Sequence, residues 1–407
     1  MAKLAAVLKD ARCREDFRQL VLFGLGYGVV LVLGYVLLRQ INLSLSPEEM
    51  GRFSYAVSAI GLSAAVLYFG GSQAYLRFHD NHRIAVRLRR CLLPLYAVAA
   101  VAVAGIAWWV TGSAAAVAYA AVPFFFERVH ILRARMESMR VNALKILELL
   151  VPIALLLVFR ENVTAARVMC FYGLGYAMCW LFPTRADSRV TSPDVKTLGR
   201  FLGPVLLTTL VAMVVEHLTV VATKTMLGYE AAAQMGVAAR NLIFLKALFS
   251  FLQMFYPVVY FREMKNARYG VVRLYRMLLV GVSLVATGAM VAGAPLLYRV
   301  TGANRYVQSS PVFVSLAIAA MLDFLFEMTA LYFQYEIKTW KATLVKVSFL
   351  GVLLSGFAIL PTLQARWTDV DPVLIFAGIV LVAAVASDIP GLVWALAAER
   401  RHRKERT

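Results

Sequence analysis

The chain has 407 residues, of which 61% are hydrophobic and 16% charged, and its mean hydropathy is +0.72. This composition excludes a soluble globular protein and is typical of a polytopic membrane protein. The formal net charge of +19 would also suit a nucleic-acid-binding protein, but no soluble basic domain is visible, so we expect no nucleic-acid partner.

Twelve apolar segments are long enough to span a bilayer, which predicts an all-α integral membrane protein with twelve transmembrane helices. Their centres lie near Val29, Ala64, Val101, Ala121, Ile153, Ala177, Met213, Lys246, Thr287, Asp323, Leu353 and Val382. Most of the 42 Lys and Arg residues fall in alternate connections between these segments. Because basic loops stay in the cytoplasm, both termini are predicted to be cytoplasmic.

The charge pattern also divides the chain into five parts. They are a basic cytoplasmic arm (1–19), six helices (20–183), a polar cytoplasmic linker (184–198), six further helices (199–397) and a basic cytoplasmic tail (398–407). Two sets of six helices that both start in the cytoplasm predict two six-helix lobes related by a parallel repeat.

Short matches between the two sets of helices support this repeat. The pair Met-Gly at 50–51 recurs at 235–236, in the second helix of each set. The motif F-x-F-E at 124–127 recurs at 324–327, in the fourth helix of each set. We therefore predict a duplicated helical bundle with a central cavity between its lobes.

The outer connection after the first helix carries a helix start signal. Ser46 is placed as the N-cap, Pro47 as the first helical residue, and Glu49 three residues after the cap. We therefore expect a helix to begin at Pro47.

The seventh segment carries a polar stripe within an apolar run. Its members, spaced by 7, 3 and 4 residues and therefore on one helical face, are Thr209, Glu216, Thr219 and Thr223. A charge at that depth costs about 2.5 to 3.5 kcal/mol on insertion scales, so it persists mainly where water, a counter-charge or a ligand receives it. We predict that this face lines a water-filled cavity.

The eighth segment carries two cations, Arg240 and Lys246. Because they are six residues apart, they point about 120° away from each other on a regular helix. A shared ligand would therefore require local unwinding of the helix or a turn at Pro257.

The tenth segment has a stripe of Asp323, Glu327 and Gln334, spaced by 4 and 7 residues. Two carboxylates one turn apart in a low dielectric repel each other, so one should hold a proton or face a cation. Arg240, Lys246 or a coupling ion would supply the positive charge. Two interpretations stay open: a functional site, or a permanent salt bridge between the eighth and tenth helices.

Two further acidic residues lie within predicted spans. Glu127 belongs to the charged inner half of the fourth helix, which must face protein or water. Asp388 lies shortly before Pro390 in the twelfth helix, and we interpret it as a pairing or kink-stabilising residue.

The sequence resembles the polysaccharide transporter family, the Wzx-type flippases of lipid-linked O-antigen units, within the superfamily that also contains multidrug and toxic-compound extruders. The resemblance is carried by L-S-P-E-E-M-G at 45–51 with Gly70-Gly71 and Arg77 downstream, and by L-G-Y-E at 227–230 with the Met-Gly pair at 235–236 and Pro257. It implies two six-helix lobes around a central cavity and an alternating-access cycle. It also implies that a polyprenyl diphosphate-linked oligosaccharide moves from the inner to the outer leaflet of the bacterial inner membrane.

Under this hypothesis Arg240 and Lys246 bind the head-group phosphates of the cargo. The cavity counter-charges or ion-coupling groups are Glu216, Asp323, Glu327 and Glu127. The polar residues that line the cavity are Thr209, Thr219, Thr223 and Gln334. No cofactor is expected, and the coupling ion would be H⁺ or Na⁺. Membrane lipids and other polysaccharide assembly proteins are the expected partners besides the glycan.

Other classes of protein remain as alternatives. An ion-coupled multidrug or cation antiporter of the same superfamily could use Asp323 and Glu327 as coupling residues. A glycan polymerase or ligase would need a large outer loop, and the outer connections here are short. The four cysteines have no metal or redox spacing, and neither a nucleophile–base pair nor a phosphate loop is visible, so we expect no enzyme. A passive assembly scaffold also stays open.

Overall fold

The computed structural model describes residues 11–67, 74–75, 78, 83–135, 137–159, 161–192, 194, 196–199, 217–265, 267–336, 338 and 340–406. Within these residues the chain is helical, and its only β-type pairing is an isolated parallel bridge between Ala85 and Asp187. The first helices are α2 (Ala11–Ser44), α3 (Pro47–Leu67), α5 (Val86–Thr111), η1 (Ala114–Ala121), α6 (Val122–Ala134), α7 (Ser138–Val158), α8 (Ala165–Ala177) and η2 (Met178–Leu181).

The later helices follow a further helical stretch at 217–227. They are α10 (Tyr229–Asn241), α11 (Ile243–Lys265), α12 (Tyr269–Ala292), α13 (Ala294–Val300), η3 (Asn304–Ser309), α14 (Ser310–Tyr335), α15 (Trp340–Arg366) and α16 (Pro372–Arg406).

In the part of the chain that the structure describes, eight helical segments are long and apolar enough to cross a membrane. One of them, Ala114–Ala134, joins η1 to α6 at the position of the expected fourth span. The first part of the expected seventh span, 201–216, lies outside the described residues. These apolar helices support the multi-pass membrane protein that the composition predicted.

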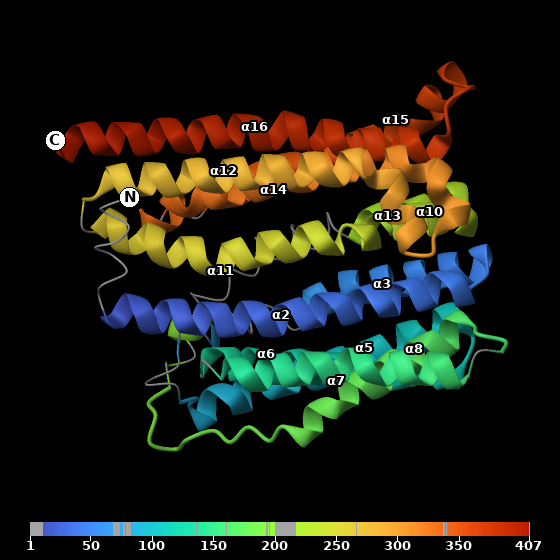
Figure 1. Ribbon diagram of the computed structural model, residues 1–407, viewed down its shortest axis with the longest axis horizontal. Helices are drawn as coiled ribbons and strands as arrows, with labels where there is room; N and C mark the ends of the chain where they lie inside the picture. The colour runs from blue at the N-terminus through green and yellow to red at the C-terminus, as the bar shows by residue number, and fades with distance from the viewer. Residues whose placement is uncertain are drawn as a thin grey trace.

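The helices fall into two groups that follow the order of the chain. Figure 1 shows α2 to α8 in the lower part of the view and α10 to α16 in the upper part, with most of the long helices roughly parallel. We refer to these groups as the N-terminal half and the C-terminal half. The start of α2 and the end of α16 lie at the same end of the molecule, which agrees with termini on one side of the membrane (Figure 1).

Both terminal helices are longer than the sequence suggested. The helix α2 already begins at Ala11, within the expected arm, and α16 runs through the expected tail to Arg406. In α16 the reason is visible, because Glu399 is buried and forms an ion pair with Arg276 of α12. That pair holds the end of α16 against the C-terminal half.

The start signal of α3 is confirmed. The helix begins at Pro47, and the backbone N–H of Glu49 donates to Ser46 Oγ at 3.3 Å. The Glu49 carboxylate accepts a hydrogen bond from the backbone N–H of Ala165 at 2.6 Å, and Ala165 is the first residue of α8. One acidic residue thus connects the starts of two helices of the N-terminal half.

The expected eighth span is divided into two helices. The helix α10 ends at Asn241 and α11 begins at Ile243, so the break falls at Leu242, between Arg240 and Lys246. Pro257, where we expected a possible turn, lies inside α11.

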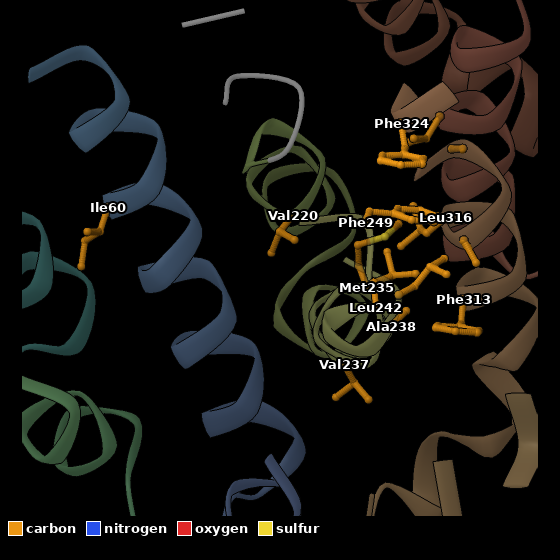
Figure 2. Close-up of a cluster of buried hydrophobic side chains, with 14 of the residues drawn as sticks. Ile60, Val220, Met235, Val237, Ala238, Leu242, Phe249, Phe313, Leu316 and Phe324 are labelled. Carbon is orange, nitrogen blue, oxygen red and sulfur yellow. The ribbon is translucent and has the colours of Figure 1, made fainter. Parts of the chain in front are cut away.

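Part of the core of the C-terminal half lies where α10 and α11 face α14. Phe249 of α11 stacks on Phe324 of α14, with ring centroids 4.3 Å apart and an angle of 5° between the ring planes. Figure 2 shows this pair beside Met235, Ala238, Leu242, Phe313 and Leu316. These contacts fix α14, and with it Asp323 and Glu327, relative to α11.

The linker after η2 docks on the N-terminal half. The Asp187 N–H donates to the Ile84 carbonyl at 2.8 Å, and Arg89 Nη1 of α5 donates to the Thr184 carbonyl at 2.5 Å. The Arg189 guanidinium donates two hydrogen bonds to the Asp187 carboxylate and lowers the pKa of that carboxyl to about 2.

Candidate functional site

The two halves meet where α3 packs against α10. Gly51 of α3 lies against the backbone carbonyl of Tyr229, and Gly236 of α10 lies against the side chain of Ser54; neither position has room for a Cβ. The Met-Gly pairs of the predicted repeat therefore mark a close approach of the two helices, which small residues permit.

Arg240 extends from α10 across this contact to α3. Its Nη2 donates to Ser54 Oγ, and its Nη1 approaches Met50 Sδ at 3.1 Å. Its Nε donates to the Gly236 carbonyl at 3.1 Å, and the guanidinium carbon lies 4.9 Å from the centre of the Phe53 ring. The side chain is thus held by neutral groups of both halves.

The electrostatic surroundings of Arg240 are unusual for a partly buried cation. No carboxylate among the described residues lies within ion-pair distance of it, and the groups that act on it electrostatically are Tyr172 and Tyr306. A cation in a water-poor site without a counter-charge is costly. The position is therefore suited to receive an anion from outside the chain.

A second cation lies at the same boundary. The Lys224 ammonium is 4.9 Å from the ring centre of Tyr55 in α3 and 5.2 Å from that of Tyr229 in α10. The two rings meet edge to face at 6.3 Å. Arg52 lies 5.7 Å from the Tyr229 ring but is paired with Glu48 at 2.8 Å. Lys224, in contrast, forms no ion pair with any described carboxylate.

The two carboxylates of α14 meet a cation that the sequence did not suggest. Lys346 of α15 forms an ion pair with Asp323, and its Nζ lies 3.8 Å from Glu327 Oε1. Gln253 Nε2 of α11 donates to Glu327 Oε2 at 2.7 Å. The stripe thus connects α11, α14 and α15 within the C-terminal half, and Arg240 takes no part in it.

Lys346 was not among the predicted site residues, because it follows Lys338 and Lys341 in a basic stretch that is typical of a cytoplasmic connection. In the structure α15 begins at Trp340, and the Lys346 side chain is 7% exposed. Asp388 of α16, which is 1% exposed, interacts electrostatically with it, as its interpretation as a pairing residue suggested. Helical continuity from Trp340 was the signal in the sequence that could have placed Lys346 inside the span.

Glu127 does not face a cavity. It is 1% exposed and accepts a hydrogen bond from Arg89 Nε of α5 at 2.9 Å. Arg89 also contacts the linker through Thr184. The predicted role of Glu127 as a cavity counter-charge is therefore replaced by an ion pair inside the N-terminal half.

The predicted polar face of the seventh segment is closed where the structure describes it. Thr219 and Thr223 are buried, and the Thr223 hydroxyl donates to the Thr219 carbonyl at 2.7 Å. Thr219 is 6% exposed and Thr223 is 0% exposed, so neither side chain is open to solvent in this conformation. Thr209, Glu216 and the side chain of Gln334 lie outside the described residues.

Lys246 lies on α11, partly buried, beyond the break at Leu242. The structure thus does not gather the predicted residues in one place: Arg240 lies at the boundary between the halves, whereas Asp323 and Glu327 lie in a separate charged cluster. Within the described residues, no group of three or more His, Cys, Asp or Glu side chains is placed to hold a metal ion.

No protein-family model and no curated protein sequence matches the chain. Several solved structures, in contrast, match the chain in fold. An inward-facing multidrug resistance MATE family transporter of the MOP superfamily superposes with a TM-score of 0.67 at 18% identity, over 93% of this chain and 99% of that chain. An outward-facing structure of a multidrug resistance MATE family transporter of the same superfamily superposes with a TM-score of 0.61 at 16% identity, over 96% of this chain and 97% of that chain.

A MOP superfamily transporter from Pyrococcus furiosus, described as having a binding pocket of reverse polarity, gives a TM-score of 0.59 at 14% identity, over 93% and 95% of the two chains. At these identities the comparisons establish the fold of a MATE-like transporter.

Proposed function

We propose that this chain is a flippase that moves a polyprenyl diphosphate-linked oligosaccharide from the inner to the outer leaflet of the bacterial inner membrane, for O-antigen or another surface polysaccharide. Its twelve helices would form two six-helix lobes around a central cavity, and it would work by alternating access. The likeness to transporters of the MOP superfamily supports the transport part of this proposal.

The observation that carries the choice of cargo is the polarity of the boundary between the halves. Arg240 and Lys224 lie there with aromatic rings and no described carboxylate partner. A diphosphate would supply the missing negative charge, and a guanidinium binds phosphate oxygens in a fork. The aromatic rings nearby, including Tyr55 and Tyr229, suit stacking against sugar rings.

Alternating access would require the contact of α3 with α10 to open. This contact lies at the ends of the helices opposite the start of α2 and the end of α16, and therefore on the outer side under the predicted orientation. A closed outer contact corresponds to a state that receives cargo from the cytoplasmic leaflet.

A second candidate function is a multidrug or cation antiporter, as in the neighbours whose names state multidrug resistance. The observation in its favour is the partial exposure of Asp323 and Glu327, whose side chains are 42% and 36% exposed. Both already share Lys346, however, which leaves less negative charge for a cationic drug.

Reconstituted proteoliposomes distinguish the two functions. We expect the protein to expose a fluorescent polyprenyl diphosphate-linked oligosaccharide to an external lectin, and Arg240→Gln to slow this exposure at least about tenfold, which corresponds to about 1.4 kcal/mol. Ser54→Ala is the matched control, since it removes one hydrogen bond to Arg240 and keeps the cation. Lys246→Gln tests the second predicted phosphate ligand.

Full flipping activity in both Arg240→Gln and Lys246→Gln would exclude the phosphate-binding role. Uptake of ethidium driven by a proton or sodium gradient, together with no movement of the lipid-linked oligosaccharide, would establish the antiporter instead.

A further inference from the structure

A cluster of basic and polar side chains in the N-terminal half has no role in the proposed site. It comprises His130 and Arg133 of α6, Asn142 and Lys145 of α7, and Tyr27 of α2. We call it the inner basic pocket. Arg133 lies in the last turn of α6, and Lys145 lies near the start of α7. Under the predicted orientation both positions lie towards the cytoplasmic side.

The three helices bring these residues together by close packing. Gly26 of α2 lies directly against the Asn142 side chain and leaves no room for a Cβ. The Lys145 ammonium is 5.9 Å from the centre of the Tyr27 ring. The His130 ring stacks on that of Phe126, with centroids 6.1 Å apart.

The pocket carries more positive than negative charge. Arg133 and Lys145 repel each other electrostatically, and both act on His130. The acidic residue that acts on Lys145 is Glu148, one turn further along α7, and no ion pair joins Arg133 or Lys145 to a carboxylate within the described residues. Two cations thus lie close together, and the carboxylate of Glu148 acts on Lys145 but not on Arg133.

The pocket also holds buried polar atoms without hydrogen-bond partners. Asn142 is 4% exposed, and neither its Oδ1 nor its Nδ2 has a partner; His130 Nδ1 and Arg133 Nε also lack one. Buried polar groups in proteins are nearly always hydrogen-bonded, so four such atoms in one place indicate a missing partner. Three of these atoms, Asn142 Nδ2, His130 Nδ1 and Arg133 Nε, can donate a hydrogen bond. Because the surrounding charge is positive, the partner of these donors should be an anion with several oxygen atoms.

We propose that the inner basic pocket binds a phosphate-class anion through Arg133 and Lys145, with His130 and Asn142 as additional hydrogen-bonding groups. A phosphate has enough oxygens to engage a guanidinium, an ammonium and an amide together. The source of the phosphate is either a lipid head group or a free phosphate or pyrophosphate. Its assignment to the diphosphate of the cargo, as a first binding position before Arg240, rests on the proposed function.

The probe for the free anion is inorganic pyrophosphate, titrated into the full-length protein in phosphatidylcholine nanodiscs and followed by calorimetry. We expect saturable binding that weakens at least about tenfold in Arg133→Gln and in Lys145→Gln. Arg140→Gln is the matched control, because Arg140 is an exposed residue of α7 paired with Glu137 at 2.6 Å; it should bind as the unchanged protein does.

The probe for a lipid head group is a nanodisc of phosphatidylcholine and phosphatidylglycerol, with the melting temperature as readout. A rise in melting temperature that Arg133→Gln and Lys145→Gln abolish, without pyrophosphate binding, would assign the pocket to a lipid phosphate. Folding of each variant is checked by its melting temperature in phosphatidylcholine alone.

Folded Arg133→Gln and Lys145→Gln variants that respond to pyrophosphate and to phosphatidylglycerol as the unchanged protein does would overturn the proposal. Absence of any response in the unchanged protein would also overturn it. Normal lectin-detected flipping in variants that have lost pyrophosphate binding would separate the pocket from the transport cycle and leave the proposed function intact.

Discussion

The acidic residue of the repeated F-x-F-E motif has opposite surroundings in the two halves of the molecule. Glu127 is 1% exposed and pairs with Arg89 at 2.9 Å. The side chain of Glu327 is 36% exposed and lies between Gln253, at 2.7 Å, and Lys346, at 3.8 Å. The same motif thus supplies a buried structural ion pair in one half and a partly exposed, shared carboxylate in the other.

The C-terminal half obtains its buried ion pair from another helix. Arg276 of α12 pairs with Glu399 of α16, which is 1% exposed and also accepts a hydrogen bond from Tyr260 at 3.4 Å. Each half therefore connects its third helix to a neighbour by a buried Arg–Glu pair. Because Glu399 fills this role in the C-terminal half, Glu327 is available to interact with groups on α11 and α15.

The largest expected effect is on stability, and it compares the two equivalent carboxylates directly. Glu127→Gln should lower the free energy of unfolding by about 3 kcal/mol, because it leaves Arg89 largely buried without its counter-charge. Glu327→Gln should lower it by less than about 1 kcal/mol, because that side chain is partly exposed and keeps an acceptor for Gln253. The measurement is the unfolding of both purified variants in one detergent. Equal losses of unfolding free energy in the two variants would show that the two carboxylates contribute equally to stability.

Features that depend on local spacing were predictable from the sequence. The cap at Ser46 and the multi-pass character follow from residue types and runs of apolar residues. The repeat of Met-Gly pairs was also visible, although its physical meaning, the close approach of α3 to α10, required the packing of both helices. A glycine pattern indicates that another helix approaches closely, but it does not identify which helix that is.

The charged partners could not be derived in the same way. Helical spacing places Asp323 and Glu327 on one face, but the cation they meet depends on how α15 is rotated against α14, and that rotation is set by tertiary packing. Spacing likewise predicted that Thr219 and Thr223 share a face, yet the face is covered by packing. Periodicity determines which residues point together, whereas the contents of the opposing surface decide whether they meet water, lipid or another side chain.

A smaller effect should follow from removing the cation of the C-terminal cluster. Lys346→Met should destabilise the protein by about 2 kcal/mol, because Asp388, which is 1% exposed, then loses the cation that acts on it among the described residues. The double variant Lys346→Met/Asp388→Asn should recover more than half of that loss, since it removes the uncompensated carboxylate as well. The coupling is measured by a double-mutant cycle of unfolding free energies. Additive losses would mean that Asp388 and Lys346 do not interact, and that the cluster consists of Lys346 and the α14 carboxylates alone.

The smallest expected effect concerns the linker, which is attached to the N-terminal half through Asp187 and Thr184. The hydrogen bonds from Arg189 lower the pKa of Asp187 to about 2, below the value of about 3.9 for a free aspartate. A depressed pKa in the folded state means that the interaction is fully present above about pH 4 and is lost as the pH falls towards 2. Amide hydrogen exchange in residues 184–192, corrected for the intrinsic rate, should therefore accelerate over this interval. In Asp187→Asn the exchange should already be faster at neutral pH and should no longer change between pH 4 and pH 2. If this variant instead shows the same pH dependence of exchange as the unchanged protein, the pH dependence belongs to another group. The linker would then be docked by the hydrogen bonds of Thr184.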